Sequence, residues 1–312
     1  MFKKSATAVT LLSVTLGVVL ALPVAAQEVT KHKEDKHVIP ASDHTVTGNV
    51  GIYSQYIFRG LTQTDGDPAI QGGVDYAHSS GFYLGAWGSN ISWLKENFTS
   101  GAGVVAGQYS SNGRLELDLY GGYKGAIGAS DVTYDLGLLY YVYPGTVAAG
   151  CTIGTATCPK ANTLEVYGGL GWKWLSAKYS YSLNDTFGWP DADGAGYLDL
   201  AASVPLGDSG ATLGLHYGIQ KYSGNIPGTA LSYNELLSYN DYRVSLAYDL
   251  GKSSKTFEGA EIGIMFTGTS SANPCGYGAF NQAGTLGGAA CTGVFPKDIS
   301  NDRTTIWLKK SF

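Results

Sequence analysis

The stretch "DVTYDLGLLYYV", residues 131–142, alternates between apolar and polar or small side chains along its length. Apolar residues occupy every second position from Val132 to Val142, and Asp135 and Gly137 lie between them. A helix would scatter the polar residues over the apolar stripe, whereas a strand places them all on the opposite face. The stretch therefore predicts a β-strand with one oily face and one polar face.

Twelve segments of the chain carry this period-two alternation. They cover residues 46–58, 68–77, 82–91, 114–124, 131–143, 162–171, 174–183, 196–204, 210–221, 241–250, 259–268 and 303–312. Most are about ten residues long, which is the length that a tilted strand needs to cross a membrane.

The connections between these segments alternate between long and short along the chain. The long ones cover residues 59–67, 92–113, 144–161, 184–195, 222–240 and 269–302. An antiparallel barrel with an even number of strands collects such long connections at one end and the short turns at the other. The sequence therefore predicts an all-β fold, a transmembrane antiparallel β-barrel of about 12 strands with short periplasmic turns and long extracellular loops.

The composition agrees with a wall that has one oily and one wet face. The 312 residues include 44 Gly and 22 Tyr, and charged residues make up 14% of the chain. An average protein has about half that share of Gly and about 25% charged residues. The mean hydropathy of -0.02 is too low for a bundle of membrane helices. The net charge of -5 comes without a basic patch, so nucleic acid is not an expected partner.

The N-terminal stretch "MFKKSATAVTLLSVTLGVVLALPVAAQ" has a basic start, an apolar middle and small residues at its end. This order predicts a signal peptide over residues 1–26, cut after Ala26. The alternative is a membrane anchor, for which the apolar run is short. Residues 27–45 are expected to form a polar periplasmic tail before an outer-membrane barrel over residues 46–312. The tail is either simply solvated or a metal-binding segment, through His32, His37 and His44.

The chain ends on "RTTIWLKKSF", residues 303–312, whose apolar row includes Ile306 and Leu308. A terminal aromatic residue, Phe312, would then lie in the interfacial girdle of the barrel. It also resembles the signal that the outer-membrane assembly machinery reads, which implies that machinery as a partner. Lys310 falls on the apolar row, where its ammonium group could reach the lipid headgroups.

Residues 51–92 carry a recognisable motif. Its first part is Ser-x-Tyr-x-x-Arg-Gly, formed by Ser54, Tyr56, Arg59 and Gly60. Further matching positions are Gln63, Pro68, Ala69, Gln71, Gly72, Gly81, Tyr83, Gly85, Trp87, Ser89 and Asn90. The segment resembles the TorF family of porin-like proteins, and the rest of the chain matches that family more loosely. The resemblance implies an outer-membrane barrel, but it implies no substrate.

The inward face of the predicted strands carries eight acidic and six basic side chains. These are Asp75, Glu116, Asp118, Asp135, Glu165, Asp199, Asp249 and Glu261, and Arg59, Lys124, Lys173, Lys178, Lys221 and Arg243. They either pair across neighbouring strands or leave an acidic excess that favours cations. Arg59 either forms part of a charged mouth or pins the first long loop through Asp65 or Asp67.

Inward aromatic residues and one histidine complete the predicted lumen. Tyr53, Tyr83, Trp87, Tyr120, Tyr141 and Tyr167 either form a slide for sugars or nucleosides or simply fill the space. His216 has Asp199 and Ser245 on neighbouring strands, as a hydrolase would require, but no catalytic motif surrounds them. The protein is therefore not expected to be an enzyme, and no cofactor is expected.

Two long loops contain all four cysteines. Cys151 and Cys158 lie in one loop, and Cys275 and Cys291 lie in another. Four cysteines allow three pairings, of which two local bridges fit the strand order and an oxidising periplasm. A zinc site is the rival interpretation, but no C-x-x-C spacing supports it.

Together these features predict a narrow porin-like channel for passive passage of small hydrophilic solutes, in the outer membrane of a Gram-negative bacterium. Its pore-lining candidates are Arg59, Tyr53, Tyr83, Trp87, Glu116, Asp118, Tyr120, Asp135, Glu165, His216, Arg243 and Glu261. The expected partners are outer-membrane lipid and small solutes. The alternative is a closed structural or surface-interaction barrel without transport activity, because a fold by itself does not settle function.

Overall fold

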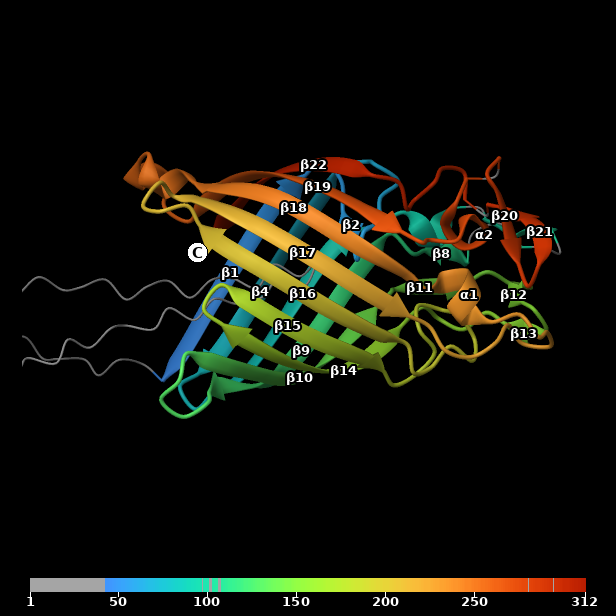
Figure 1. Ribbon diagram of the computed structural model, residues 1–312, viewed down its shortest axis with the longest axis horizontal. Helices are drawn as coiled ribbons and strands as arrows, with labels where there is room; N and C mark the ends of the chain where they lie inside the picture. The colour runs from blue at the N-terminus through green and yellow to red at the C-terminus, as the bar shows by residue number, and fades with distance from the viewer. Residues whose placement is uncertain (1–42, 97, 101–102, 106–107, 280, 294) are drawn as a thin grey trace, which may run out of the picture.

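The computed structural model describes residues 43–96, 98–100, 103–105, 108–279, 281–293 and 295–312. Twelve strands form a closed antiparallel barrel, in the order β1-β22-β19-β18-β17-β16-β15-β14-β10-β9-β5-β4 (Figure 1). Their bounds are β1 His44–Tyr53, β4 Ala69–His78, β5 Phe82–Asn90, β9 Leu115–Ala126, β10 Val132–Val142, β14 Thr163–Trp172, β15 Leu175–Ser182, β16 Gly196–Pro205, β17 Ala211–Lys221, β18 Tyr239–Asp249, β19 Ala260–Ser270 and β22 Arg303–Ser311.

Eleven of the twelve observed strands agree with the sequence prediction within two residues at each end. The first strand is the exception, because β1 ends at Tyr53 and does not run on to residue 58. On a strand over residues 46–58, Tyr56 and Phe58 would share the outward apolar face with Val50 and Ile52, but they are only 2% and 7% exposed. The barrel prediction is confirmed, and the prediction for residues 54–58 is wrong.

The two faces of the wall follow the alternation of the sequence. In β10, Leu136 and Leu138 point outward and are 57% and 50% exposed, whereas Leu139 and Tyr141 are buried inside. β10 pairs with β9 and β14 without a register shift, so the alternation is not interrupted. The outer surface is consequently an apolar band, and the inner surface carries the polar residues.

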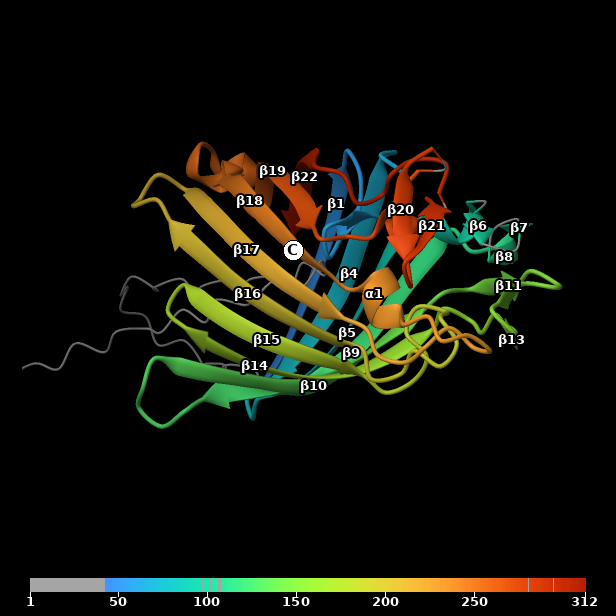
Figure 2. The same cartoon turned by 45° about the vertical axis from the view of Figure 1, so that its right-hand side comes forward.

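The ends of the barrel differ as predicted, since the long connections gather at one end and the short turns at the other (Figure 1). Short elements fold within the long connections, and most of them lie at that end of the barrel (Figure 2). They are β2 Ile57–Phe58, β3 Leu61–Thr62, η1 Trp93–Lys95, β6 Phe98–Ser100, β7 Gly103–Val105, β8 Tyr109–Asn112, β11 Gly145–Val147, β12 Thr152–Ile153, β13 Ala156–Thr157, α1 Tyr233–Leu237, α2 Pro274–Tyr277, β20 Ala283–Leu286 and β21 Ala289–Thr292. Two 3₁₀ turns, η2 Leu250–Lys252 and η3 Lys255–Phe257, lie in a short connection at the opposite end. None of the described helices is long and apolar enough to cross a membrane.

The barrel closes where its first and last strands pair. β1 and β22 run side by side from Asn49 opposite Ser311 to Tyr53 opposite Trp307. The terminal residue extends this seam, because the backbone groups of Gly48 and Phe312 exchange two hydrogen bonds of 3.2 and 2.9 Å. Lys310 was expected to reach toward headgroups, but its ammonium group donates to the Glu258 carbonyl.

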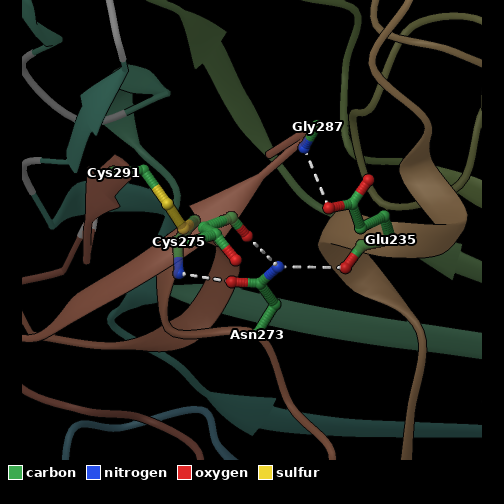
Figure 3. The surroundings of a disulfide bond; sticks show 6 residues. Glu235, Asn273, Cys275, Gly287 and Cys291 are labelled. Carbon is green, nitrogen blue, oxygen red and sulfur yellow. Dashed lines mark hydrogen bonds between the residues drawn. A yellow bond between two sulfur atoms is a disulfide. The ribbon is translucent and has the colours of Figure 1, made fainter. Parts of the chain in front are cut away.

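The four cysteines form the two local disulfides, Cys151–Cys158 and Cys275–Cys291, with Cα–Cα distances of 5.4 and 5.8 Å. Figure 3 shows the second bridge beside the side chain of Asn273, which accepts from the Cys275 amide at 3.0 Å. The same side chain donates to the Glu235 carbonyl at 3.1 Å, so this bridge is tied to the neighbouring long connection.

Reducing both disulfides is expected to leave the barrel folded, because both bridges lie in loops and neither lies in a wall strand. Closing loops of this size stabilises a chain by about 2.5 to 3 kcal/mol on the chain-entropy estimate. On that estimate the bridges act by restricting the unfolded chain, and the hydrogen bonds of the wall do not depend on them. Far-ultraviolet circular dichroism of the refolded protein with and without reductant checks this expectation. Loss of the strand signal on reduction would contradict it.

Candidate functional site

A hairpin occupies the lumen. We call residues 54–64 the lumen hairpin; it contains β2 and β3, which pair with each other. Its tip is formed by Arg59 and Gly60, with φ angles of 46° and 82°. A two-residue turn with positive φ at both positions suits Gly at its second residue. A Cβ atom at Gly60 would lie 2.6 Å from the Cβ of Asp241, so the tip presses against β18.

The base of the lumen hairpin is fixed to the wall and to the last long connection. The amide of Ser54 donates to the Ile306 carbonyl at 2.9 Å, and the amide of Thr62 donates to the Ile299 carbonyl at 3.0 Å. Within the hairpin, the Gln63 amide donates to the Tyr56 carbonyl at 2.8 Å. These bonds replace the wall pairing that β1 gives up after Tyr53.

Arg59 joins the hairpin tip to the opposite wall. Its Nη2 donates to both carboxylate oxygens of Glu165 at 2.8 Å, and its Nη1 donates to Gln220 at 2.8 Å. The guanidinium carbon lies 4.2 Å from the ring centre of Tyr197 and 4.8 Å from that of Phe58. A planar guanidinium suits this combination of paired hydrogen bonds and ring contacts, which an ammonium group cannot reproduce.

The structure contradicts both roles that the sequence suggested for Arg59. Arg59 does not form a charged mouth, because it is buried inside the barrel. It also does not pin its loop through Asp65 or Asp67, because its ion pair among the described residues is with Glu165, and Asp65 pairs with Lys297 at 3.0 Å. The hydrogen bond to Asp65 raises the pKa of Lys297, and this ion pair ties the first and last long connections together.

Glu116 and Asp118 lie on the inner face of β9, beside the hairpin. The two oxygens of Glu116 accept hydrogen bonds from the hydroxyl groups of Tyr56 and Tyr143 at 2.6 and 2.8 Å. Asp118 is 0% exposed, and within the described part of the chain neither of its oxygens has a hydrogen-bond partner. Lys178, on β15, also lacks an acceptor there, and its Nζ lies 4.8 Å from the ring centre of Tyr167.

His216 lies between two carboxylates on the far side of the hairpin tip. Its Nδ1 is 3.2 Å from Asp199 and its Nε2 is 2.7 Å from Asp241, whose second oxygen accepts from Tyr197 at 2.9 Å. Both ring nitrogens face carboxylate oxygens, an arrangement that suits a ring with a proton on each nitrogen. The hydrolase arrangement does not form, since Ser245 pairs with Gly214 in the wall and not with His216.

A small cavity of about 30 Å³ separates the hairpin tip from this wall. It is lined by the tip residues, by the His216 cluster and by Arg243. A cavity of this volume can hold water molecules. The hairpin is therefore packed closely against β16 to β19, with room for water but not for a solute.

The other candidates form two further clusters on the inner wall. Tyr83 donates to Asp135 at 2.6 Å and contacts the hydroxyl of Tyr167, while Tyr120 donates to Asp75 at 2.5 Å. On the opposite side, Glu261 accepts from Trp307 at 2.9 Å and pairs with Lys309 at 3.0 Å, and Tyr53 stacks on the Trp307 ring. The hydroxyl groups of Tyr83, Tyr120 and Tyr167 are therefore engaged by carboxylates or by one another.

The structure places the twelve candidate residues on the inner side of the barrel, but it also adds residues that the sequence reasoning missed. The missed ones are Tyr143, Phe187, Tyr197, Gln220, Asp241 and Trp307. Tyr197 and Gln220 share a face with Asp199 and His216, so the strand alternation could have identified them. Phe187 lies in a loop, and no local signal indicates that it contacts the rings of Phe58 and Tyr141.

Pairing accounts for only part of the inner charge. Arg59 pairs with Glu165, His216 with two aspartates, and Lys309 with Glu261. Among the described residues, Glu116 and Asp118 have no cation within ion-pair distance. No group of three or more His, Cys, Asp or Glu residues in the described ranges is arranged to hold a metal ion.

Comparison with known proteins adds a family but no activity. Among solved structures, the barrel is similar to the KdgM porin, with 8% identity, a TM-score of 0.43 and coverage of 85% of this chain and 99% of that one. It is also similar to an outer membrane channel from Pseudomonas putida F1, with 13% identity, a TM-score of 0.46 and coverage of 88% and 100%. TM-scores and identities this low support no argument about function.

No curated protein matches the chain. A family model described as "Bacterial protein of unknown function (Gcw_chp)" matches residues 37–292, which is most of the sequence. The chain therefore belongs to the Gcw_chp family of bacterial proteins of unknown function.

Proposed function

We propose that this protein is an outer-membrane channel for passive passage of small hydrophilic solutes, with the lumen hairpin limiting their size. The observation that carries the proposal is the two-faced wall. Large apolar side chains are exposed along the outer face, from Val46 to Leu308, while charged and hydroxyl side chains fill the inner face. An exposed apolar band of this kind needs lipid around it, and a polar interior needs water within it.

Unpartnered polar atoms support a hydrated lumen. In the described ranges these include the head groups of Lys178, Ser180 and Ser182, at successive inward positions of β15. Buried polar atoms in proteins are normally hydrogen-bonded to protein or to ordered water. We therefore expect ordered water molecules to supply the missing hydrogen-bond partners along this row of β15.

Three sequence features agree with an outer-membrane location. The signal peptide predicted over residues 1–26 and most of the predicted tail lie outside the described residues, and both remain predictions. Phe312 lies at the barrel seam, where an assembly factor could read it. The resemblance of residues 51–92 to the TorF family also supports a porin-like role.

The alternative function is a closed surface barrel, and the lumen hairpin favours it. Phe58 and Arg59 are both buried, and the tip contacts two walls. A barrel closed in this way would present its long loops to the outside without transporting anything. The two functions therefore differ in whether ions cross the barrel while the hairpin is docked.

Single-channel recording of the refolded full chain in a planar bilayer tests the proposal. We expect small, steady conductance steps from the parent protein. A variant in which Gly and Ser replace residues 56–62 should show larger steps, because the hairpin no longer fills the lumen. Silence from both proteins, with both inserted and folded, would reject the channel and leave the closed surface barrel.

The proposed topology makes a separate prediction. A protease site inserted near Gly224 or Thr285, both in long connections, is expected to be cut when protease is added to intact cells. A site near Ser209, in a short turn, is expected to be cut only after the outer membrane is permeabilised. Immunoblotting of the fragments measures both results. Cleavage at Ser209 alone in intact cells would mean that the barrel is inserted the other way round.

A further inference from the structure

We propose that Glu116 and Asp118 form a binding site for a small monovalent cation, such as Na⁺ or K⁺, beside the lumen hairpin. The inference rests on the proposed function, because the ion must reach the site through a hydrated lumen. It begins from Asp118, whose carboxylate is fully buried and has no hydrogen-bond partner for either oxygen among the described residues.

Among the described residues, no cation forms an ion pair with this carboxylate. Arg59 is committed to Glu165 and Gln220, and the His216 ring is held by its two aspartates. In the ranges that the structure describes, Lys178 forms no ion pair, and its Nζ lies over the Tyr167 ring. A buried carboxylate without a partner is strongly unfavourable, so Asp118 requires a counter-ion or a proton.

The surroundings of Asp118 favour a counter-ion. Glu116 lies two positions earlier on the same face of β9, about 7 Å away along the strand. Trp87 and Tyr141 are the cross-strand neighbours of Asp118, and Tyr56 contacts the Trp87 ring at 5.5 Å. Carboxylate oxygens and aromatic faces are both attractive to a cation.

The composition of the site indicates which kind of cation it holds. Two carboxylates with hydroxyl neighbours provide hard oxygen ligands, which suit hard cations and not soft transition metals. Resident calcium sites usually have more carboxylate ligands, and no such group of three occurs in the described ranges. A monovalent ion that exchanges readily is therefore the occupant to which the proposal commits.

The site is also linked to the lumen hairpin. Tyr56 belongs to the hairpin and donates to Glu116, so the same carboxylate faces the hairpin and the ion. A cation held there would neutralise charge directly beside the constriction. In a conducting barrel this site would be a resting point for cations and would disfavour anions.

Thermal unfolding of the refolded full chain in a zwitterionic detergent tests the site without any need for conductance. The protein is heated in NaCl, KCl or N-methylglucamine chloride at equal ionic strength. A ligand that binds only the folded state raises the unfolding temperature with its concentration. We expect a saturating rise with Na⁺ or K⁺ and none with the bulky organic cation.

Two variants sharpen this test. Asp118→Asn keeps the shape of the side chain and removes its charge, so the response to Na⁺ and K⁺ should disappear. Asp135→Asn is the matched control, because Asp135 is also an inner-wall carboxylate but accepts a hydrogen bond from Tyr83. It should keep the response of the parent. If Asp118→Asn does not fold, the unfolding temperatures of the parent in the three salts still decide whether the site binds a cation.

The outcomes separate the site from the channel. Equal unfolding temperatures of the parent in all three salts would overturn the cation site and indicate a protonated Asp118. A stronger response to CaCl₂ at matched ionic strength would overturn the monovalent assignment. A salt response without conductance would keep the site and reject the channel. In a conducting barrel, Asp118→Asn should lower the preference for K⁺ over Cl⁻ in a KCl gradient, and an unchanged preference would count against the site.

Discussion

Replacing Arg59 by alanine is expected to release the lumen hairpin, raise the single-channel conductance and destabilise the barrel. The substitution removes the hydrogen bonds to Glu165 and Gln220 and the ring contact with Tyr197. It also leaves the buried Glu165 carboxylate without its cation, and breaking a buried pair in this way typically costs 3–5 kcal/mol. We expect the free energy of unfolding to fall by about 3 kcal/mol, which is the lower end of this range. Water that enters after the hairpin moves would partly hydrate Glu165.

A double-mutant cycle isolates the ion pair from the hairpin. Glu165→Gln removes the negative charge, so the Arg59→Ala and Glu165→Gln double variant should be more stable than Arg59→Ala alone. Urea unfolding in detergent gives the free energies, and planar-bilayer recording gives the conductance. Arg59→Lys is the matched control for charge, since lysine keeps the charge but lacks the second nitrogen with which Arg59 donates to Gln220 while it pairs with Glu165. Parent-like stability and conductance in Arg59→Ala would show that the hairpin does not depend on its tip.

Arginine at position 138 is expected to cost about 2–4 kcal/mol of folding free energy in a bilayer, because Leu138 lies on the outer, apolar face of β10. The matched control is Ser245→Arg, which places the same charge in the middle of β18 on the inner face. Gly214 lies opposite Ser245 in the wall and leaves room for the longer side chain. Folding of the control should stay close to that of the parent, while its conductance shifts toward anions.

Gly137 is unsuitable for this comparison, although the sequence alone suggests it as the inner neighbour of Leu138. A Cβ atom there would lie 2.5 Å from the Tyr167 hydroxyl and 2.7 Å from the Gly121 carbonyl. An arginine at Gly137 would therefore fail for lack of space and not because of its charge. Folding yield into liposomes, followed by gel mobility, measures the Leu138→Arg and Ser245→Arg effects. A severe loss for Ser245→Arg with none for Leu138→Arg would mean that the two faces are exchanged.

The sequence by itself determined the wall of the barrel. Alternation is a local property, because each strand turns every second side chain to the same face. The strand over residues 131–142 could therefore be predicted without information about its neighbours. The spacing of long and short connections determined which end holds the loops. The two cysteine pairs are separated by only 7 and 16 residues, so their local bridges were also within reach of the sequence.

Only the tertiary structure decided what fills the lumen. The alternation of β1 continues through Tyr56 and Phe58, and an apolar row fits a hairpin packed inside the barrel as well as a strand facing lipid. The closed barrel decides between these two positions, because it brings Arg59 to Glu165 and Gln220, which lie 106 and 161 positions away in the chain. Contacts at such separations depend on register and curvature around the whole ring of strands, and a local pattern carries no information about them.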